Sequence, residues 1–141
     1  MSGMTFGPYI SFDGRCEEAF HFYEKCLGAT IVGIYRYEGS PMEAQVPSDW
    51  GQKVMHSTLT LDGVTVMMGE DAPPNRYKAP QGFSMSVSVN DPAEADSVFQ
   101  ALAECGTVTV PIQQTFWTVR FGMLVDRFGV GWMINCEQAP T

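Results

Sequence analysis

Apolar residues recur at helical spacing in two stretches of the chain. In the stretch 14–28, with the sequence GRCEEAFHFYEKCLG, one stripe is formed by Cys16, Ala19, Phe20, Tyr23, Cys26 and Leu27. In the stretch 91–106, the stripe is formed by Ala95, Val98, Phe99, Leu102 and Ala103. This spacing predicts one amphipathic helix in each stretch. Asp91 suits the N-cap of the second helix, and we expect Gly28 and Gly106 to end the two helices.

Strand-like runs precede and follow each predicted helix. They span 9–12, 30–37, 54–61 and 64–68 in the first half, and 83–89, 108–113, 118–125 and 130–136 in the second. Each half therefore has the order strand, helix, strand, strand, strand, and a proline-containing linker at about 72–81 joins them. This repeat predicts an α+β fold of two βαβββ modules, about 5–71 and 82–137, with cupped mixed β-sheets and the helices on the outside.

The alternation of apolar and polar residues along two predicted strands indicates which side chains face the helix and which face away from it. In 83–89 the odd positions are apolar and the even ones are Ser84, Ser86 and Ser88. In 54–61 we expect Met55, Leu59 and Leu61 to face the helix, and His56, Thr58 and Thr60 to face away from it. Sheets with such polar faces can border a cavity for a small ligand.

The chain has 141 residues and a formal net charge of −8. Its eight Lys and Arg residues are scattered, which argues against a nucleic-acid partner or an anionic membrane surface. The acidity fits either solubility or a cationic ligand. No stretch approaches about 18 apolar residues and no signal-peptide pattern is present, so we expect a cytoplasmic protein. Cys16, Cys26 and Cys105 lie on or beside helix stripes and are expected to be buried, reduced thiols.

Three segments, GPYISFDGRCEEAFHFYEKCLGA, VMHSTLTLDGVTVMMGEDA and QTFWTVRFGMLVDRFGVGWMIN, closely resemble the PhnB-like branch of the vicinal oxygen chelate superfamily. This superfamily includes glyoxalase I, extradiol dioxygenases, fosfomycin-inactivating enzymes and bleomycin-sequestering proteins. The resemblance implies two βαβββ modules, a homodimer, and a divalent metal at the centre of the cupped sheets. It does not identify an activity, because members share a scaffold and not a reaction.

The resemblance also indicates where metal ligands are expected. These positions fall at Gly7, or with an indel Pro8 or Tyr9, and at Glu70, Ser84 and Met133. A hard divalent ion prefers carboxylates or imidazoles, and only Glu70 supplies one. We therefore expect no cofactor, with a relocated divalent metal held by His56 and Glu70 as the alternative.

His56 and Glu70 are the candidate catalytic residues. His56 is the histidine on the predicted polar face, and it is either a structural histidine or a general base. Glu70 is either a solvated residue at a strand end or an acid in the cavity, alone or with His56. His21, on the helix flank, is expected to be solvated.

Further residues are candidates for ligand binding. The run TFWTVRFG brings Phe116, Trp117, Arg120 and Phe121 close together, either as an aromatic wall with one cation or as a core or dimer-interface cluster. Trp50 lies in the long loop 38–53, which is either a lid or binding loop or partly disordered. The other candidates for ligand binding lie on the strands that the resemblance places at the site. They are Tyr9, Ser84, Ser86 and Met133.

Two functions of different class follow. The first is an enzyme acting on a small polar metabolite, an isomerase or a lyase, with His56 and Glu70 transferring protons. The second is a metal-free binding protein that sequesters a cationic or aromatic compound, as bleomycin-resistance relatives do. Relatives of this branch often carry a demethylubiquinone methyltransferase label, but the chain has no glycine-rich cofactor loop of the G-x-G-x-x-G type. We therefore do not expect methyl transfer.

Overall fold

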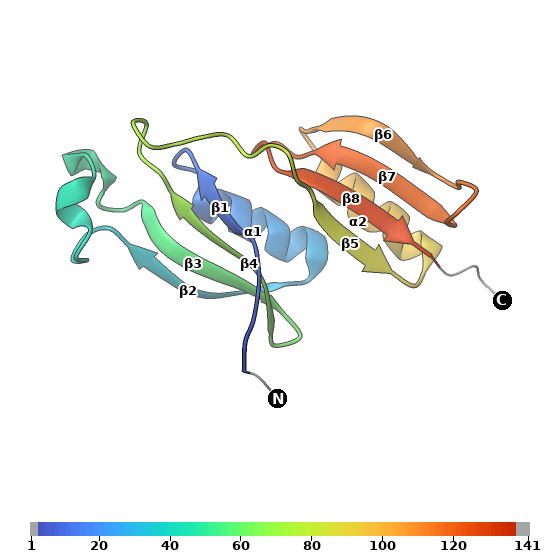
Figure 1. Cartoon of the computed structure of the whole chain (residues 1–141), viewed down its shortest axis with the longest axis horizontal. Helices are drawn as coiled ribbons and strands as arrows, with labels where there is room; N and C mark the ends of the chain where they lie inside the picture. Colours follow the sequence, from blue (N-terminus) through green and yellow to red (C-terminus); the bar gives the residue numbers. More distant parts are fainter. Residues whose placement is uncertain (1–2, 138–141) are drawn as a thin grey trace. The chain divides into compact units, whose positions relative to one another are not determined.

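The computed structural model describes residues 3–137. The chain divides between Ala79 and Pro80 into two compact units. Each unit is a four-stranded mixed sheet with one helix packed on it, and both have the element order βαβββ (Figure 1). The predicted α+β fold with two βαβββ modules is confirmed. In the part of the chain that the structure describes, no helix is long and apolar enough to cross a membrane.

The first unit contains β1 (Tyr9–Phe12), α1 (Cys16–Leu27), β2 (Thr30–Arg36), β3 (Val54–Leu61) and β4 (Val64–Asp71). Its strand order is β1-β4-β3-β2, with β1 parallel to β4 and the other pairs antiparallel. Helix α1 covers one face, where Phe20 is fully buried. A Cβ atom at Gly69 would lie 2.9 Å from the Phe20 ring, so this close approach of α1 to β4 requires glycine.

The second unit contains β5 (Met85–Val89), α2 (Pro92–Ala103), β6 (Thr107–Gln113), β7 (Arg120–Val125) and β8 (Gly131–Cys136). Its strand order is β5-β8-β7-β6, and the parallel pair is β5 with β8. Trp132, Ile134 and Cys136 alternate as the buried positions of β8. The second unit thus repeats the topology of the first.

Most of the predicted strand faces are confirmed, but Phe83, expected on the helix side of its sheet, is 47% exposed. Ser86 and Ser88 are exposed, while His56 and Thr58 alternate with the buried Ser57 and Leu59. The expectation that Leu61 faces the helix is wrong, because Leu61 is 39% exposed. The register of β3 against β4 shifts between Leu59 and Thr60, which interrupts the alternation.

The helix ends differ in the two units. Helix α1 ends at Gly28, whose φ of 72° gives the predicted left-handed cap. Helix α2 begins as expected, with the Asp91 side chain accepting a hydrogen bond from the Ala93 amide. It ends at Ala103, before Gly106, and Cys105 adopts a positive φ of 60°. This turn leaves Cys105 exposed, so the expectation that its thiol is buried is wrong.

A buried carboxylate organises the turn before β8. Asp126 is 4% exposed, and its Oδ1 accepts hydrogen bonds from the amides of Phe128 and Val130 at 2.8 and 3.0 Å. Its Oδ2 accepts one from the Trp132 indole at 2.8 Å. The Gly129 amide also donates to the Asp126 carbonyl oxygen at 3.0 Å, which closes a tight turn over 126–129. The first residue of this turn thus also holds the Trp132 side chain, the largest one buried in the following strand.

Candidate functional site

Three strands of the first unit carry polar side chains on the sheet face away from α1. Ser57 pairs with Gly69, and both lie on the α1 face. The adjoining residues, His56 and Glu70, therefore project from the other face. Tyr9 of β1 reaches the same place, because its ring stacks on the His56 ring with centroids 5.7 Å apart. We define Tyr9, His56 and Glu70 as the candidate site.

Hydroxyl groups contact both ring nitrogens of His56. The Tyr9 oxygen lies 3.4 Å from Nδ1, and Thr58 Oγ1 lies 3.3 Å from Nε2. The Tyr9 hydroxyl also donates to the Met55 carbonyl oxygen at 3.4 Å. Since Tyr9 has a single proton, this pattern assigns the His56 proton to Nδ1 and leaves the lone pair on Nε2. All three contacts are long, so a ligand can replace them at low cost.

Tyr9 is held in its protonated form. Burial, followed by the negative charge of Glu70, raises the pKa of Tyr9 to about 12, while the positive charge of Arg76 acts in the opposite direction. A phenol with this pKa is uncharged at neutral pH. Tyr9 therefore offers a proton to an acceptor and does not act as a base.

Glu70 is engaged through one of its two carboxylate oxygens. Its Oε2 accepts hydrogen bonds from Ser11 Oγ at 2.9 Å and from Arg76 Nη1 at 2.8 Å. The Glu70 side chain is only 14% exposed, whereas that of Arg76 is 48% exposed. Within residues 3–137, no side chain or amide hydrogen-bonds to Oε1. This oxygen is available to a ligand.

Tyr37 connects this ion pair to the backbone. Its hydroxyl accepts a hydrogen bond from Arg76 Nη2 at 3.1 Å and donates one to the Asp71 carbonyl oxygen at 2.7 Å. The Tyr37 side chain is 1% exposed. The position of Arg76 is thus fixed by a buried residue.

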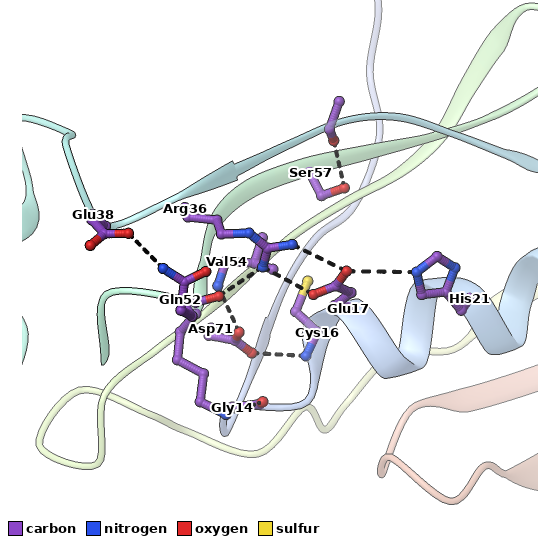
Figure 2. Close-up of polar contacts among 12 residues, drawn as sticks. Gly14, Cys16, Glu17, His21, Arg36, Glu38, Gln52, Val54, Ser57 and Asp71 are labelled. Carbon is purple, nitrogen blue, oxygen red and sulfur yellow. Dashed lines mark hydrogen bonds and ion pairs between the residues drawn. The ribbon is translucent and has the colours of Figure 1, made fainter. Parts of the chain in front are cut away.

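Asp71 anchors the same strand end from the α1 side. Its carboxylate accepts hydrogen bonds from the amide of Cys16 at 2.8 Å and from the amide of Val54 at 2.9 Å, as Figure 2 shows. The N-cap residue of α1, Arg15, makes no side-chain cap of its own. Asp71 therefore joins the start of α1, the start of β3 and the end of β4. Burial raises the pKa of Asp71, against the opposing effect of these amides and of Lys53.

A second polar cluster in the same view lies along α1. Arg36 Nη1 bonds to Glu17 at 3.0 Å, and Glu17 lies 3.7 Å from the ring of His21 (Figure 2). The His21 side chain is 56% exposed, as the sequence led us to expect, and also lies 3.1 Å from Glu24. These contacts link α1 to β2 and stay apart from His56, which faces the other side of the sheet.

The loop that contains Trp50 is ordered by local contacts. It holds two short 3₁₀ helices, η1 (Glu43–Gln45) and η2 (Ser48–Trp50). The Trp50 ring packs edge-on against Tyr37 with centroids 6.4 Å apart. Trp50 therefore lies beside Tyr37, which bonds to Arg76, and its contact with a ligand stays a prediction.

The ligand-binding candidates of the second unit fall into two groups. Ser86 pairs with Met133 on the sheet face away from α2, where Met123 lies beside Met133. Phe116 is 96% exposed and Trp117 is 58% exposed, and the Trp117 ring contacts both Phe116 and Phe121. Ser84, just before β5, is close to Gly131 of β8.

Arg120 does not join these aromatic side chains. Its Nε bonds to Asp96 Oδ1 of α2 at 3.2 Å, so it lies on the helix side of its sheet. Phe121, the next residue, faces the opposite way. The expectation of an aromatic wall with Arg120 as its cation is therefore wrong. The alternation of side chains along 118–125 already places Arg120 and Phe121 on opposite faces of the sheet.

The residues at the inherited metal positions do not fit a divalent ion. They supply the Tyr9 phenol, the Glu70 carboxylate, the Ser84 hydroxyl and the Met133 thioether, and only the carboxylate is a ligand that hard cations prefer. Glu70 also has the guanidinium of Arg76 beside it, which repels a cation. Within the described residues, no three His, Cys, Asp or Glu side chains gather as a metal site would require. A site built from His56 and Glu70 would have to recruit further ligands.

Sequence reasoning missed Arg76 and Tyr37. Arg76 lies in the segment read as a proline-containing linker, and Tyr37 at the end of a strand. A lone arginine in a linker carries no periodic signal, so only its contact with Glu70 identifies it.

Comparisons with known proteins agree with this architecture. The family model described as 3-demethylubiquinone-9 3-methyltransferase matches residues 4–135. Protein YjdN of Escherichia coli is 33% identical, with 98% of this chain and 99% of YjdN covered. The crystal structure of protein PA1353 from Pseudomonas aeruginosa is 41% identical, covers 97% of this chain and 100% of its own, and has a TM-score of 0.87.

Two further structures are similar to this chain, one in sequence and fold and the other in fold alone. A putative 3-demethylubiquinone-9 3-methyltransferase, PhnB protein, from Bacillus cereus is 27% identical, covers 94% of this chain and 99% of its own, and has a TM-score of 0.79. A glyoxylase/bleomycin resistance protein/dioxygenase domain from Frankia shares the fold, with a TM-score of 0.63 at 14% identity over 98% of this chain and 99% of its own. The chain therefore belongs to the family described as 3-demethylubiquinone-9 3-methyltransferase, the PhnB-like branch, and it has the fold of the vicinal oxygen chelate proteins.

Proposed function

We propose that the chain is an enzyme that binds a small polar carbonyl compound beside Tyr9, His56 and Glu70 and moves a proton on it. The observation that carries this proposal is the approach of the Tyr9 hydroxyl to His56, on the face that also bears Glu70. An uncharged phenol beside an imidazole whose Nε2 makes one long contact, to the Thr58 hydroxyl at 3.3 Å, provides a proton donor and a base in one place. Both residues come from strands, which hold side chains more rigidly than loops do.

The chemical step balances with these groups alone. His56 Nε2 takes the proton from the carbon next to the carbonyl, and the electron pair of the C–H bond forms the C=C bond of an enolate. The carbonyl π electrons move to oxygen, which the Tyr9 hydroxyl stabilises by hydrogen bonding. When the acidic carbon carries a hydroxyl group, the intermediate is an enediolate; transfer of that hydroxyl proton to the former carbonyl oxygen and return of the carbon-bound proton to the former carbonyl carbon isomerise the compound. When the carbon on the other side of the acidic carbon carries a leaving group, its departure with the electron pair, as the carbonyl re-forms, makes the reaction an elimination. Glu70 Oε1 is available to orient a substrate hydroxyl.

Deuterium exchange tests this proposal without knowledge of the natural substrate. We expect the protein in D2O to accelerate loss of the C–H proton signal next to the carbonyl of 2-oxobutyrate, measured by proton NMR. His56→Gln should reduce the accelerated rate by roughly two to four orders of magnitude, the usual contribution of a general base. His21→Gln, on exposed α1, is the matched control and should leave the rate unchanged. No exchange above the protein-free rate would count against the proposal.

Two other readings are less favoured. The sequestering protein is not favoured, because the resistance-type structures share only the fold with this chain. Methyl transfer is the activity named in the family description, and we do not extend it to this chain, whose sequence has no G-x-G-x-x-G loop. Binding of S-adenosylmethionine with methylation of a phenolic acceptor would reverse this choice.

We also propose that the protein works as a homodimer. Support comes from Phe116 and Trp117, since exposed aromatic side chains are enriched where subunits meet. Light scattering should give twice the 15.6 kDa mass of the chain. A stable monomer at micromolar concentration would contradict the proposal.

A further inference from the structure

Arg76 is the cation nearest the candidate site. Its Nη1 and Nη2 atoms each make one hydrogen bond, to Glu70 and to Tyr37. A guanidinium has more N–H donors than these two bonds use. Its side chain is 48% exposed, so the remaining donors are accessible to a ligand. Through Glu70 it adjoins Ser11 of β1, the strand that also carries Tyr9.

The guanidinium is also held in place before any ligand binds. Tyr37, which is 1% exposed, accepts its Nη2 hydrogen bond, and the Trp50 ring packs against Tyr37. The Arg76 amide donates to the Pro73 carbonyl oxygen at 2.8 Å, which fixes the backbone. A fixed guanidinium loses little conformational freedom on binding.

The charge around Arg76 restricts what it can bind. The chain carries a formal net charge of −8, so an anion is repelled by most of the surface and needs a specific cation to bind. The planar guanidinium matches the two oxygens of a carboxylate. A small neutral compound would gain nothing from this group.

We propose that the substrate is a small carboxylic acid with a carbonyl group, and that Arg76 binds its carboxylate. With the carboxylate on the exposed N–H groups of Arg76, the carbonyl oxygen points to the Tyr9 hydroxyl and the acidic carbon to His56 Nε2. Tyr37 is a positioning residue, because it acts only through Arg76. The carbonyl placement rests on the proposed function, whereas carboxylate binding by Arg76 does not.

The test compares 2-oxobutyrate with 2-butanone, a neutral ketone without the carboxylate. Binding is measured by saturation-transfer NMR on the ligand signals, and by the His56 Hε1 resonance with His21 as the internal reference. We expect 2-oxobutyrate to bind saturably and 2-butanone to bind at least roughly ten-fold more weakly, as expected when hydrogen bonds to a charged group are lost. Arg76→Gln should weaken binding of 2-oxobutyrate to the same extent.

Three further variants separate recognition from folding and from chemistry. Arg76→Lys keeps the charge but loses the planar pair of donors, so it should bind with intermediate affinity. Tyr37→Phe keeps the ring against Trp50 but removes the hydroxyl that bonds to Arg76 and to the Asp71 carbonyl oxygen. It should weaken binding of 2-oxobutyrate by the folded protein several-fold, and it should also lower the melting temperature. Arg127→Gln, which removes an exposed ion pair with Glu104 in the second unit, is the matched control and should bind normally.

The outcomes distinguish the two proposals. Saturable binding that depends on Arg76, without deuterium exchange, supports this inference and removes the proton-transfer function. Exchange of 2-oxobutyrate and 2-butanone at equal rates, unaffected by Arg76→Gln, supports the function and overturns this inference. Absence of saturable 2-oxobutyrate binding up to about 10 mM, a range in which even weak ligands bind, also overturns it.

Discussion

Replacement of Asp71 by alanine should strongly destabilise the first unit. The Asp71 carboxylate is 1% exposed, and it accepts the amides of Cys16 and Val54 at 2.8 and 2.9 Å. Alanine leaves both amides without an acceptor in the protein interior. Asparagine has the same shape and keeps one acceptor oxygen, so it loses one of the two bonds.

The expected loss in free energy of unfolding follows from these two amide donors. A buried donor without a partner costs about 1–3 kcal/mol, so Asp71→Ala should lower the free energy of unfolding by about 2–6 kcal/mol. Asp71→Asn should lower it by about 1–3 kcal/mol. The matched control is Glu17→Gln, which removes the exposed ion pair with Arg36 and should cost no more than about 1 kcal/mol.

Urea denaturation followed by circular dichroism measures these differences. Trp50 fluorescence reports the first unit, because its ring packs against Tyr37, whose hydroxyl bonds to the Asp71 carbonyl. The reasoning is refuted if Asp71→Ala costs less than the Glu17→Gln control. It is also refuted if Asp71→Asn lowers the free energy of unfolding as much as Asp71→Ala does. The acceptor oxygen retained by asparagine would then contribute nothing to stability.

Further predictions concern ionisation, metal content and packing. Because the pKa of Tyr9 is raised to about 12, the stability from its uncharged form is present below its unfolded pKa of about 10 and is lost as the pH rises through 12. The ionisation of Tyr9 is measured as the difference in absorbance at 295 nm between the wild type and Tyr9→Phe. At about pH 11, this difference should show that Tyr9 is still mostly protonated. Glu70→Gln should increase the ionised fraction of Tyr9, because it removes a negative charge. Metal analysis of the purified protein should find no stoichiometric zinc, nickel, manganese or iron, and a chelator should leave the melting temperature unchanged. One metal ion per chain in the wild type that is absent from His56→Gln would contradict this prediction and would support a metal site at His56 and Glu70. Gly122→Ala should destabilise the second unit by about 1–3 kcal/mol, because its Cβ would lie 2.6 Å from the Phe99 ring and 2.9 Å from the backbone of Ile112; urea denaturation that shows no change would contradict this packing argument.

The sequence by itself determined the elements and their faces. Helix periodicity and the glycine at position 28 placed α1, and the Asp91 cap placed the start of α2. Alternation put His56 and Thr58 on the face away from the helix, where the structure has them. These signals are local, because the periods of a helix and a strand are set within a few residues. Alternation also separates Arg120, on the α2 side of its sheet, from Phe121 on the opposite face.

Only the tertiary structure decided which side chains meet. The contact of Tyr9 with His56 joins residues 47 positions apart, and that of Ser11 with Glu70 joins residues 59 apart. Asp71 and Glu70 are neighbours in sequence, yet one is a buried cap for α1 and the other an acid with an open oxygen. The roles of Asp71 and Glu70 depend on which side of β4 is covered by α1. That is decided by the packing of the helix on the sheet. Arg76 likewise acquires its place from Glu70 and Tyr37, since no periodic pattern in a linker can fix where an arginine lies.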